Sequence, residues 1–385
     1  MSDKKVFALN LGSSSTKVAY AENGKIIYRE TIYHVGEEFA ACTGFYEQEP
    51  LRLAAVEKNM KDHGVDCGGL DAIIARGGML QPLPVGVFRI NEALVEQSYS
   101  GIYGKHPSSM GAKIALDLAN AYGTIPLTAD VPSSDELLPV ARYTGLKEIQ
   151  RRTMTQTLNA RAVIREWAAK QGKTYEEINA ITVGLGGGMN TIAHCHGRMI
   201  DTNNSVDGEG CFSTNRCLTV PIDKLISECY SGKYTYEEMC WHVNGSAGLL
   251  GYLGTIDMLE ILRRIQDGDK YADEVVEAMC YQIAKDIGAF ATTLCGDVDV
   301  IILAGGMANS PIITDRIVKR VKFIAPVVVR PGELEMEALC ENAFWALDGQ
   351  VPIHEFIPAK DEFEAAARIN EIWAKSDWTF ERSKK

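Results

Sequence analysis

Small hydroxyl side chains, a glycine and one lysine follow an apolar segment near the start of the chain, and this combination can bind phosphate. Residues 6–11 are almost all apolar and predict a buried strand, which Gly12, three serines and a second strand from Lys17 follow. Backbone N–H groups and hydroxyls of such a turn can surround an anion. A strand follows the turn where a helix would follow the Gly-Lys-Ser phosphate loop, so that loop is excluded. An ordinary tight turn is the alternative.

A second glycine-rich turn repeats this design about half a chain later. Residues 180–183 predict a buried strand, and a turn holding Gly186, Gly187 and Gly188 leads from it into an outgoing strand. Two similar hairpins at this separation predict a duplicated domain. Two such domains could hold phosphate between their hairpins.

A third glycine turn has a different continuation. Residues 301–304 predict a strand that leads into Gly305, Gly306 and Met307 and then into a helix. The N-terminus of a helix presents unpaired N–H groups to an anion, so this turn could hold part of a nucleotide.

Three polar side chains lie where predicted elements end or begin. Arg76 follows the buried strand 72–75 and precedes two glycines, and Asp130 follows the strand 126–128. His106 lies just before an amphipathic helix that Ser108 or Ser109 could cap. Ligands of α/β folds bind at the carboxyl ends of strands, so these residues are candidates for a site. A solvated arginine and a structural histidine are the alternatives.

A polar loop and a further arginine complete the candidates. Residues 201–210 form a long loop with carboxylates flanked by glycine, a feature that favours function, and Arg216 follows it. The preceding predicted helix, 154–169, carries Arg161 and Arg165 one turn apart. The charged segment 146–152 predicts a hinge. We therefore expect one domain over 1–150, completed by residues 336–385, and a second over 151–335.

Composition limits the partners. The chain has 385 residues, 46% of them hydrophobic and 23% charged, and a net charge of −12, so two globular domains are expected and nucleic acid or an anionic membrane is not the expected partner. No apolar stretch reaches the length of a membrane span, and the first strand leaves no room for a signal peptide. The ten cysteines contain no Cys-x-x-Cys pair and predict reduced thiols in a cytoplasmic protein.

Two hairpin domains and a nucleotide-type turn together predict phosphoryl transfer. This chemistry depends on positioning and charge neutralisation, helped by Mg²⁺. The candidate cations are Lys17, Arg76, His106 and Arg216. Oxygen ligands for Mg²⁺, bound directly or through water, could come from Asn10, Asp130 and Glu335.

These residues lie in motifs that resemble the acetate and butyrate kinases, and butyrate kinases most of all. The matching segments are residues 9–17, 76–82, 103–106, 185–188, 201–210 and 331–333, which read LNLGSSSTK, RGGMLQP, YGKH, LGGG, DTNNSVDGEG and PGE. The resemblance implies an α/β fold of two duplicated actin-like ATPase (ribonuclease H-like) domains with an ATP cleft between them. It also implies reversible phosphorylation of a short-chain carboxylate by ATP, which gives an acyl phosphate and ADP, and a homodimer formed through the second domain.

The resemblance assigns a role to each candidate. It implies metal binding by Asn10 and by Glu335, with Glu333 as the lesser alternative; phosphate binding by Ser13, Ser15, Lys17, Gly186, Gly187 and Gly188; adenosine binding by Asp257, Gly305, Gly306, Met307 and Ala308; and catalytic roles for Arg76, His106, Asp130 and Arg216. A carboxylic acid has a pKa of about 4 to 5 and is ionised at neutral pH, so it needs no general base. We therefore expect Asp130 to hold a water on Mg²⁺ or to orient Arg216.

The sequence departs from the family pattern near the same motifs. Butyrate kinases usually have a His where this chain has Gln156, a His where it has Gly184, and an Asn where it has Ser109. Residues 214–218 read TNRCL where PERSG is expected. A butyrate kinase-like activity is the first hypothesis. The alternatives are a kinase for another small carboxylate and a catalytically weak, nucleotide-binding regulator.

Overall fold

The computed structural model describes residues 3–379, and its contacts divide the chain into two compact units. The first unit comprises Met1–Asp135, Thr157–Ala162 and Leu334–Ile372, and the second comprises Glu136–Gln156, Val163–Glu333 and Trp373–Lys385. These bounds differ from those of the domains predicted above, whose limits stay a prediction. Within residues 3–379, no helix is long and apolar enough to cross a membrane.

The first unit is built on a seven-stranded sheet with the strand order β12-β5-β6-β4-β1-β2-β3. Strands β1, β2 and β3 are antiparallel neighbours, and β1, β4 and β6 run parallel. The strands are β1 (Lys5–Leu11), β2 (Ser15–Glu22), β3 (Lys25–Tyr33), β4 (Ala72–Ala75), β5 (Val87–Arg89), β6 (Ile125–Ala129) and β12 (Ile353–Glu355).

The second unit is built on a five-stranded sheet with the order β11-β10-β7-β8-β9. Here β7, β8 and β9 are antiparallel neighbours, and β7, β10 and β11 run parallel. The strands are β7 (Asn179–Gly184), β8 (Asn190–Cys195), β9 (Arg198–Thr202), β10 (Val300–Gly305) and β11 (Val327–Pro331).

The two sheets share one topology. The order β3-β2-β1-β4-β6 of the first sheet and the order β9-β8-β7-β10-β11 of the second match strand for strand, in sequence order and in direction. Each begins with an antiparallel three-stranded meander and continues with two parallel strands. The predicted α/β fold with a duplicated domain is therefore confirmed.

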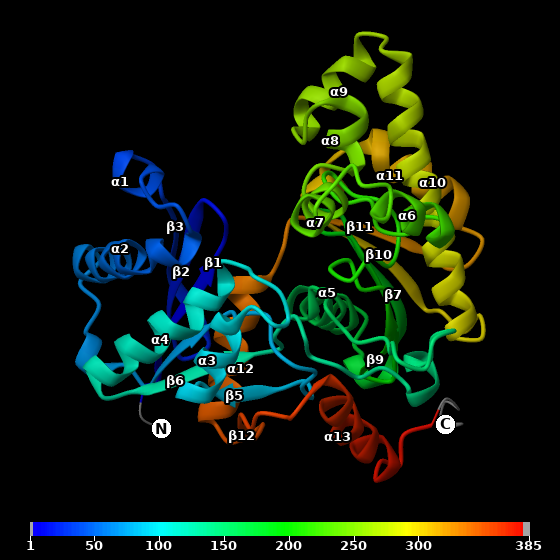
Figure 1. The fold of residues 1–385 in the computed structure, drawn as a ribbon. Coiled ribbons are helices and arrows are strands. Elements are labelled where there is room, and N and C mark those ends of the chain that lie inside the picture. The colour runs from blue at the N-terminus through cyan, green and yellow to red at the C-terminus, as the bar shows by residue number, and fades with distance from the viewer. Residues whose placement is uncertain (1–2, 380–385) are drawn as a thin grey trace. The chain divides into compact units, whose positions relative to one another are not determined.

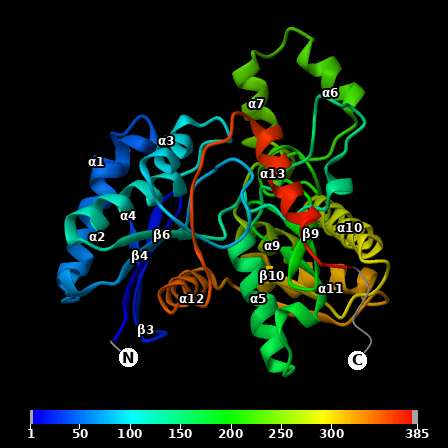
Figure 2. The ribbon, with the colours of Figure 1, turned by 90° about the horizontal axis from the view of Figure 1, so that it is seen from below.

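Helices cover both faces of the first sheet. Alternate residues of β1 enter two different cores: Phe7 and Leu9 pack with α4, whereas Val6 and Ala8 pack with α12. Figures 1 and 2 show α4 and α12 on opposite sides of these strands. The helices of this unit are α1 (Glu37–Ala40), α2 (Glu49–Asp62), α3 (Glu92–Ser100), α4 (Ser108–Tyr122) and α12 (Glu335–Leu347).

The long helix α10 supplies much of the second core. Its buried residues pack against Ile181, Val183 and Leu303 of the second sheet. The helices of this unit are α6 (Ile222–Cys229), α7 (Tyr236–Asn244), α8 (Gly248–Leu253), α9 (Met258–Gln266), α10 (Lys270–Thr293) and α11 (Pro311–Val321). Helices α5 (Thr157–Lys170) and α13 (Glu362–Ala374) contribute residues to both units. Single 3₁₀ turns are η1 (Phe45–Gln48), η2 (Cys67–Gly69), η3 (Pro139–Arg142), η4 (Tyr175–Glu177) and η5 (Gly306–Asn309).

Several predicted boundaries need correction. Helix α5 begins at Thr157, three residues after the predicted start at 154. Neither Ser108 nor Ser109 caps α4, because both lie inside its first turn and Pro107 occupies the cap position. The third glycine turn forms the 3₁₀ turn η5 before α11 begins.

Candidate active site

The first predicted phosphate turn is held from beneath by a buried arginine. Arg52 of α2 is fully buried, and its guanidinium donates to the carbonyl oxygens of Gly12 (2.9 Å), Ser13 (2.7 Å) and Ser15 (3.3 Å). Burial lowers the pKa of Arg52, which nevertheless stays charged, because an arginine does not lose its proton in proteins. The Gly12 N–H closes the turn on the Ser15 carbonyl (2.8 Å).

This arrangement decides which way the turn directs its N–H groups. A trans peptide points its N–H opposite to its C=O. Because Arg52 draws the Gly12 and Ser13 carbonyls inward, the N–H groups of Ser13 and Ser14 point away from Arg52. Both serines are exposed and Ser15 is half-buried. The turn thus presents donors to its outer side, as an anion site requires.

Four predicted residues lie around the carboxyl ends of β1 and β4, Lys17 on β2 and Glu335 at the start of α12. Asn10 is buried, and its Nδ2 donates to Oε2 of Glu335 (2.6 Å), the first residue of α12. Arg76 Nη1 lies 3.4 Å from the same oxygen. Lys17 pairs with Asn10 across β1 and β2, so the two side chains share one face. The structure therefore brings Asn10, Lys17, Arg76 and Glu335 together.

The two glycines after Arg76 are required by close packing. A Cβ at Gly77 would lie 2.4 Å from Val131 Cγ1, and one at Gly78 would lie 2.8 Å from Ser109 Cα. Neither position has a positive φ. The motif thus lets the segment after β4 pass directly against the start of α4 and the end of β6.

His106 lies just before α4, and hydrogen bonds from Ser108 hold its ring. The Ser108 N–H donates to His106 Nδ1 (3.1 Å), and Ser108 Oγ lies 2.8 Å from the same nitrogen. Since Nδ1 accepts a backbone hydrogen bond, the neutral ring carries its proton on Nε2. His106 can therefore donate to an anion from Nε2 in both of its charge states.

Asp130 has a strained backbone and an arginine partner. Its φ of 42° lies in the left-handed region, which is uncommon for residues other than glycine and often marks a functional site. The Gly86 N–H donates to its Oδ1 (3.1 Å), and Arg161 Nε lies 3.2 Å from its Oδ2. The carboxylate is almost completely buried, so Arg161 supplies the charge that it needs there.

In the second unit, the two later glycine turns pack against each other. The Leu185 N–H donates to Ala304 O (2.7 Å), and the Met307 N–H donates to Leu185 O (3.2 Å). Gly305 has a φ of 101°, and a Cβ there would lie 2.4 Å from Leu185 O. Glycine at position 305 is therefore required, and it brings Gly306 and Met307 beside the turn of Gly186, Gly187 and Gly188.

At other positions of these turns, no neighbouring atom requires the residue to be glycine. Gly186, Gly187 and Gly306 have no positive φ, and an added Cβ would approach no neighbour closer than 3.8 Å. A glycine at such a position leaves the backbone open to close approach by a group from outside the chain. This is the property that a phosphate or nucleotide contact requires.

Arg216 lies beside the second glycine turn. Its Nη1 donates to the Ser205 carbonyl (3.0 Å) and to Ser205 Oγ (3.2 Å). A Cβ at Gly188 would lie 3.2 Å from the same nitrogen, so glycine there admits the guanidinium. Burial lowers the pKa of Arg216. The structure thus brings Arg216 together with Gly188.

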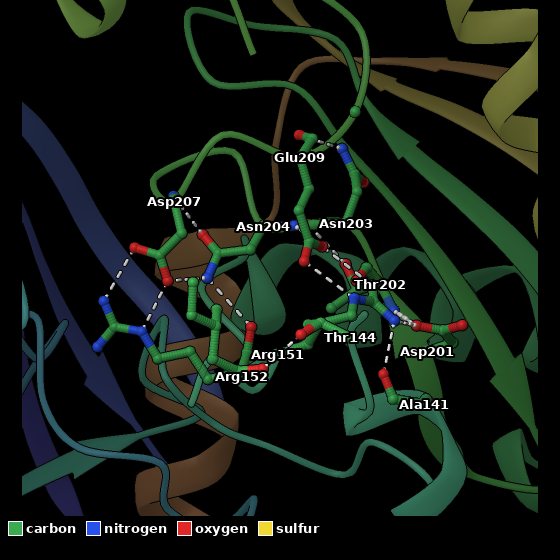
Figure 3. A network of polar contacts seen from close by, with 12 residues as sticks. Ala141, Thr144, Arg151, Arg152, Asp201, Thr202, Asn203, Asn204, Asp207 and Glu209 are labelled. Atoms are coloured by element: carbon green, nitrogen blue, oxygen red, sulfur yellow. Dashed lines mark hydrogen bonds and ion pairs between the residues drawn. The ribbon is translucent and has the colours of Figure 1, made fainter. Parts of the chain in front are cut away.

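The carboxylates of the polar loop 201–210 bind two arginines of the same unit (Figure 3). Arg151 donates to Asp201 Oδ1 (2.9 Å), to both oxygens of Glu209 (2.9 and 3.0 Å), and to the Thr202 carbonyl (2.6 Å). Arg152 binds both oxygens of Asp207 (2.7 and 2.9 Å). These carboxylates therefore fix the shape of the loop, and Ser205 is the loop residue that contacts Arg216.

Asp257 has the contacts of a helix cap. Its Oδ1 accepts the N–H of Leu259 (2.9 Å) and that of Glu260 (3.4 Å) at the start of α9, and the side chain is exposed. An exposed cap is compatible with a ligand contact and does not require one. Its predicted role near adenosine stays a prediction.

Sequence reasoning missed the residues that support the site, namely Arg52, Arg151 and Ser205. Arg52 and Arg151 resemble surface arginines in a sequence, because nothing local shows that distant carbonyls and carboxylates surround them. Arg161 was noticed only for its spacing from Arg165. One signal could have pointed to these residues. The turn 12–15 and the loop 201–210 contain carbonyl and carboxylate groups that find no partner nearby in the sequence, so each needs a donor from elsewhere in the chain.

Comparison with known proteins shows to which family the chain is related. The family model described as "Acetokinase family" matches residues 147–342. Butyrate kinase 2 of Clostridium acetobutylicum is 39% identical over 90% of this chain and 97% of its own length. A protein of Caldanaerobacter subterraneus named "Probable butyrate kinase 2" is 42% identical over 90% of this chain and 98% of its own length.

A solved structure supports the fold independently. The acetate kinase of Porphyromonas gingivalis superposes with a TM-score of 0.72, at 17% identity, over 89% of this chain and 100% of that one. At this identity the likeness shows the fold alone, which is the actin-like α/β fold expected from the sequence. The matched family model and the relatives above establish that the chain belongs to the acetokinase family.

Proposed function

We propose that the protein transfers the γ-phosphate of ATP to a short-chain carboxylate, butyrate or a branched relative, and so forms an acyl phosphate and ADP reversibly. The observation that carries the proposal is the identity of 39% and 42% to butyrate kinases over 90% of the chain. The geometry of the candidate residues supports it, because both units present donors and cations suited to anions.

The first unit supplies donors for the carboxylate and the moving phosphoryl group. The nucleophile is already an anion at neutral pH, so the enzyme must neutralise repulsion rather than remove a proton. Arg76 and the Nε2 side of His106 serve this purpose, and Ser13, Ser15 and Lys17 donate to phosphate. Asp130 keeps Arg161 in place, since the two groups form a buried ion pair.

The second unit supplies the other phosphate contacts. The backbone N–H groups of Gly186, Gly187 and Gly188 bind phosphate oxygens, and the Arg216 guanidinium stabilises the charge that develops in transfer. Gly305, Gly306 and Met307, with Asp257, lie along the adenosine. The unforced glycines at 186, 187 and 306 support these assignments.

Mg²⁺ fits the donor set of the first unit. The residues that the structure describes hold no group of three or more His, Cys, Asp or Glu side chains able to bind a metal. Mg²⁺ bound to a nucleotide needs fewer, because it keeps several waters and takes phosphate oxygens. Asn10 and Glu335 lie side by side and would hold it through an amide and a carboxylate oxygen. When bound, Mg²⁺ neutralises charge on the phosphates.

An assay with several acids tests the proposal. Purified protein is incubated with ATP, Mg²⁺ and acetate, propionate, butyrate, isobutyrate or isovalerate, while ADP release is followed and hydroxylamine traps any acyl phosphate. Turnover with butyrate or a branched acid supports the proposal and shows which chain length the substrate pocket accepts. ATP binding without turnover on any acid would instead favour the nucleotide-binding regulator, which the departures at Gln156 and Gly184 make the second candidate.

We also propose that the protein forms a homodimer through its second unit and works in the cytoplasm. Large apolar side chains stay exposed on α6, α7 and α9 and just after α6, among them Ile222, Tyr230, Trp241 and Leu259. Contiguous exposed apolar surface often marks an interface. The described cysteines are all thiols, and ATP is supplied in the cytoplasm. Light scattering should give twice the monomer mass, and Trp241→Glu with Tyr230→Glu should lower it.

A further inference from the structure

Gly184 is a glycine that the strand itself does not require. It ends β7, where it pairs with Asn190 of β8 and with Ala304 of β10. Its φ is not in the left-handed region. Glycine weakens the interior of a strand, so its presence between two partner strands needs a reason.

The side chain of Gln156 lies against Gly184. A Cβ at Gly184 would lie 2.6 Å from Gln156 Oε1 and 3.3 Å from its Cδ, whereas a real Cβ does not approach another atom so closely. The carboxamide of Gln156 therefore occupies the place that a side chain at position 184 would take.

The side-chain amide of Gln156 binds the glycine turn 186–188. It occupies the cap position of α5 and makes no cap hydrogen bond with its side chain. Its Nε2 donates instead to the carbonyl oxygen of Gly188 (3.1 Å). This bond fixes the peptide plane between Gly188 and Met189, and so the last peptide of the turn that the proposed function assigns to phosphate.

We propose that Gln156 is a positioning residue for the turn of Gly186, Gly187 and Gly188, and that Gly184 and Gln156 act as one coupled pair. This inference rests on the proposed function only in treating that turn as a phosphate site. Two of the positions at which the chain departs from the family pattern are thus in contact.

If the two residues are coupled, each single substitution disturbs the turn, whereas combining the two adds no further disturbance. Gly184→Ala puts a Cβ 2.6 Å from the Gln156 amide oxygen and pushes the amide away from the Gly188 carbonyl. Gln156→Ala removes the amide outright. Once Gln156 is alanine, the added Cβ at 184 has room, and the second change costs nothing more.

A double-mutant cycle on the full chain measures this coupling. The dissociation constant of MgATP is determined by calorimetry for the wild type, Gln156→Ala, Gly184→Ala and the double variant, with thermal unfolding followed in parallel. We expect each single variant to bind MgATP about 5- to 20-fold more weakly, and the double variant to bind no more weakly than Gln156→Ala. A double variant whose loss is the product of the single losses would overturn the proposal.

Gln156→Glu separates hydrogen bonding from packing. The substitution keeps the shape of the side chain, but an ionised carboxylate cannot donate to the Gly188 carbonyl. We expect MgATP binding at pH 8 to be at least as weak as in Gln156→Ala, with an unfolding temperature close to that of the wild type. Binding of wild-type strength by Gln156→Glu would contradict a positioning role. Wild-type protein that binds MgATP but phosphorylates no acid would refute the proposed function and leave this test intact.

Discussion

At the scale of single residues, the buried pair of Asp130 and Arg161 has the clearest consequence. Asp130→Asn removes the carboxylate charge that faces the buried Arg161 guanidinium. Breaking a buried ion pair from one side costs about 3–5 kcal/mol. We expect this loss in the free energy of unfolding by urea, together with lower activity. The double variant Asp130→Asn with Arg161→Met should recover most of the stability, and a double variant as unstable as Asp130→Asn would refute the pairing.

A second residue-scale prediction concerns pH. Burial raises the pKa of Asp286 in α10 from 3.8 to about 6, although it accepts the Cys211 N–H (3.0 Å). A carboxyl whose pKa is higher in the folded chain binds more protons there, so this group makes the free energy of unfolding fall as pH rises from about 4 to about 6. Above about pH 7 the cost stays constant, at about 3 kcal/mol.

Asp286→Asn keeps an acceptor for Cys211 and removes the titration. Relative to wild type, the variant should therefore gain stability between pH 4.5 and pH 7.5, as urea unfolding at each pH would measure. Asp267→Asn, the same substitution at an exposed side chain, serves as the control and should follow the wild type. Parallel curves for wild type and Asp286→Asn would show that Asp286 does not titrate in this range.

At the scale of elements, the loop 201–210 depends on one arginine. Arg151 binds Asp201, Glu209 and the Thr202 carbonyl, and the loop in turn offers Ser205 to Arg216 (Figure 3). Arg151→Ala leaves carboxylates without their counter-charge, and we expect a loss of about 2–4 kcal/mol in the free energy of unfolding. Turnover should fall by about tenfold or more, because Arg216 loses its support.

An exposed ion pair of the same unit provides the control for Arg151. Lys233 pairs with Glu228 at the surface, at 3.0 Å. Lys233→Ala should change the free energy of unfolding by less than about 1 kcal/mol and leave turnover unchanged. Equal effects of the two substitutions would mean that the loop is not held by Arg151.

The elements themselves divide into those that local patterns predict and those that they do not. The two glycine hairpins follow from apolar segments and turn residues, and the structure confirms them. Strands β5 and β12 span three residues each and were not predicted, since so short a segment has no visible period. The site behaves likewise: Arg76 was predicted because it follows a strand and precedes two glycines, whereas Arg52 was missed because its three carbonyl partners lie about 40 residues away.

At the scale of the whole molecule, the first unit cannot be cut out of the chain at one point. Val6 and Ala8 of β1 and Ile74 of β4 share a core with Leu339 and Phe344 of α12, which lies near the other end of the sequence. Removing a buried leucine or phenylalanine from a core costs about 2–5 kcal/mol, and losing the helix removes several such residues at once. Residues 1–150 therefore lack one complete side of their core.

We expect residues 1–150 expressed alone to aggregate or to bind a hydrophobic dye such as ANS, because one apolar face of the first sheet is then exposed to water. Co-expression with residues 151–385 supplies α12 again and should recover a complex that elutes as the intact protein does. The comparison separates the loss of these core segments from the loss of chain continuity, since both samples are cut at the same place. A fragment 1–150 that unfolds cooperatively on its own, without binding the dye, would show that the sheet needs no helix from the far end of the chain.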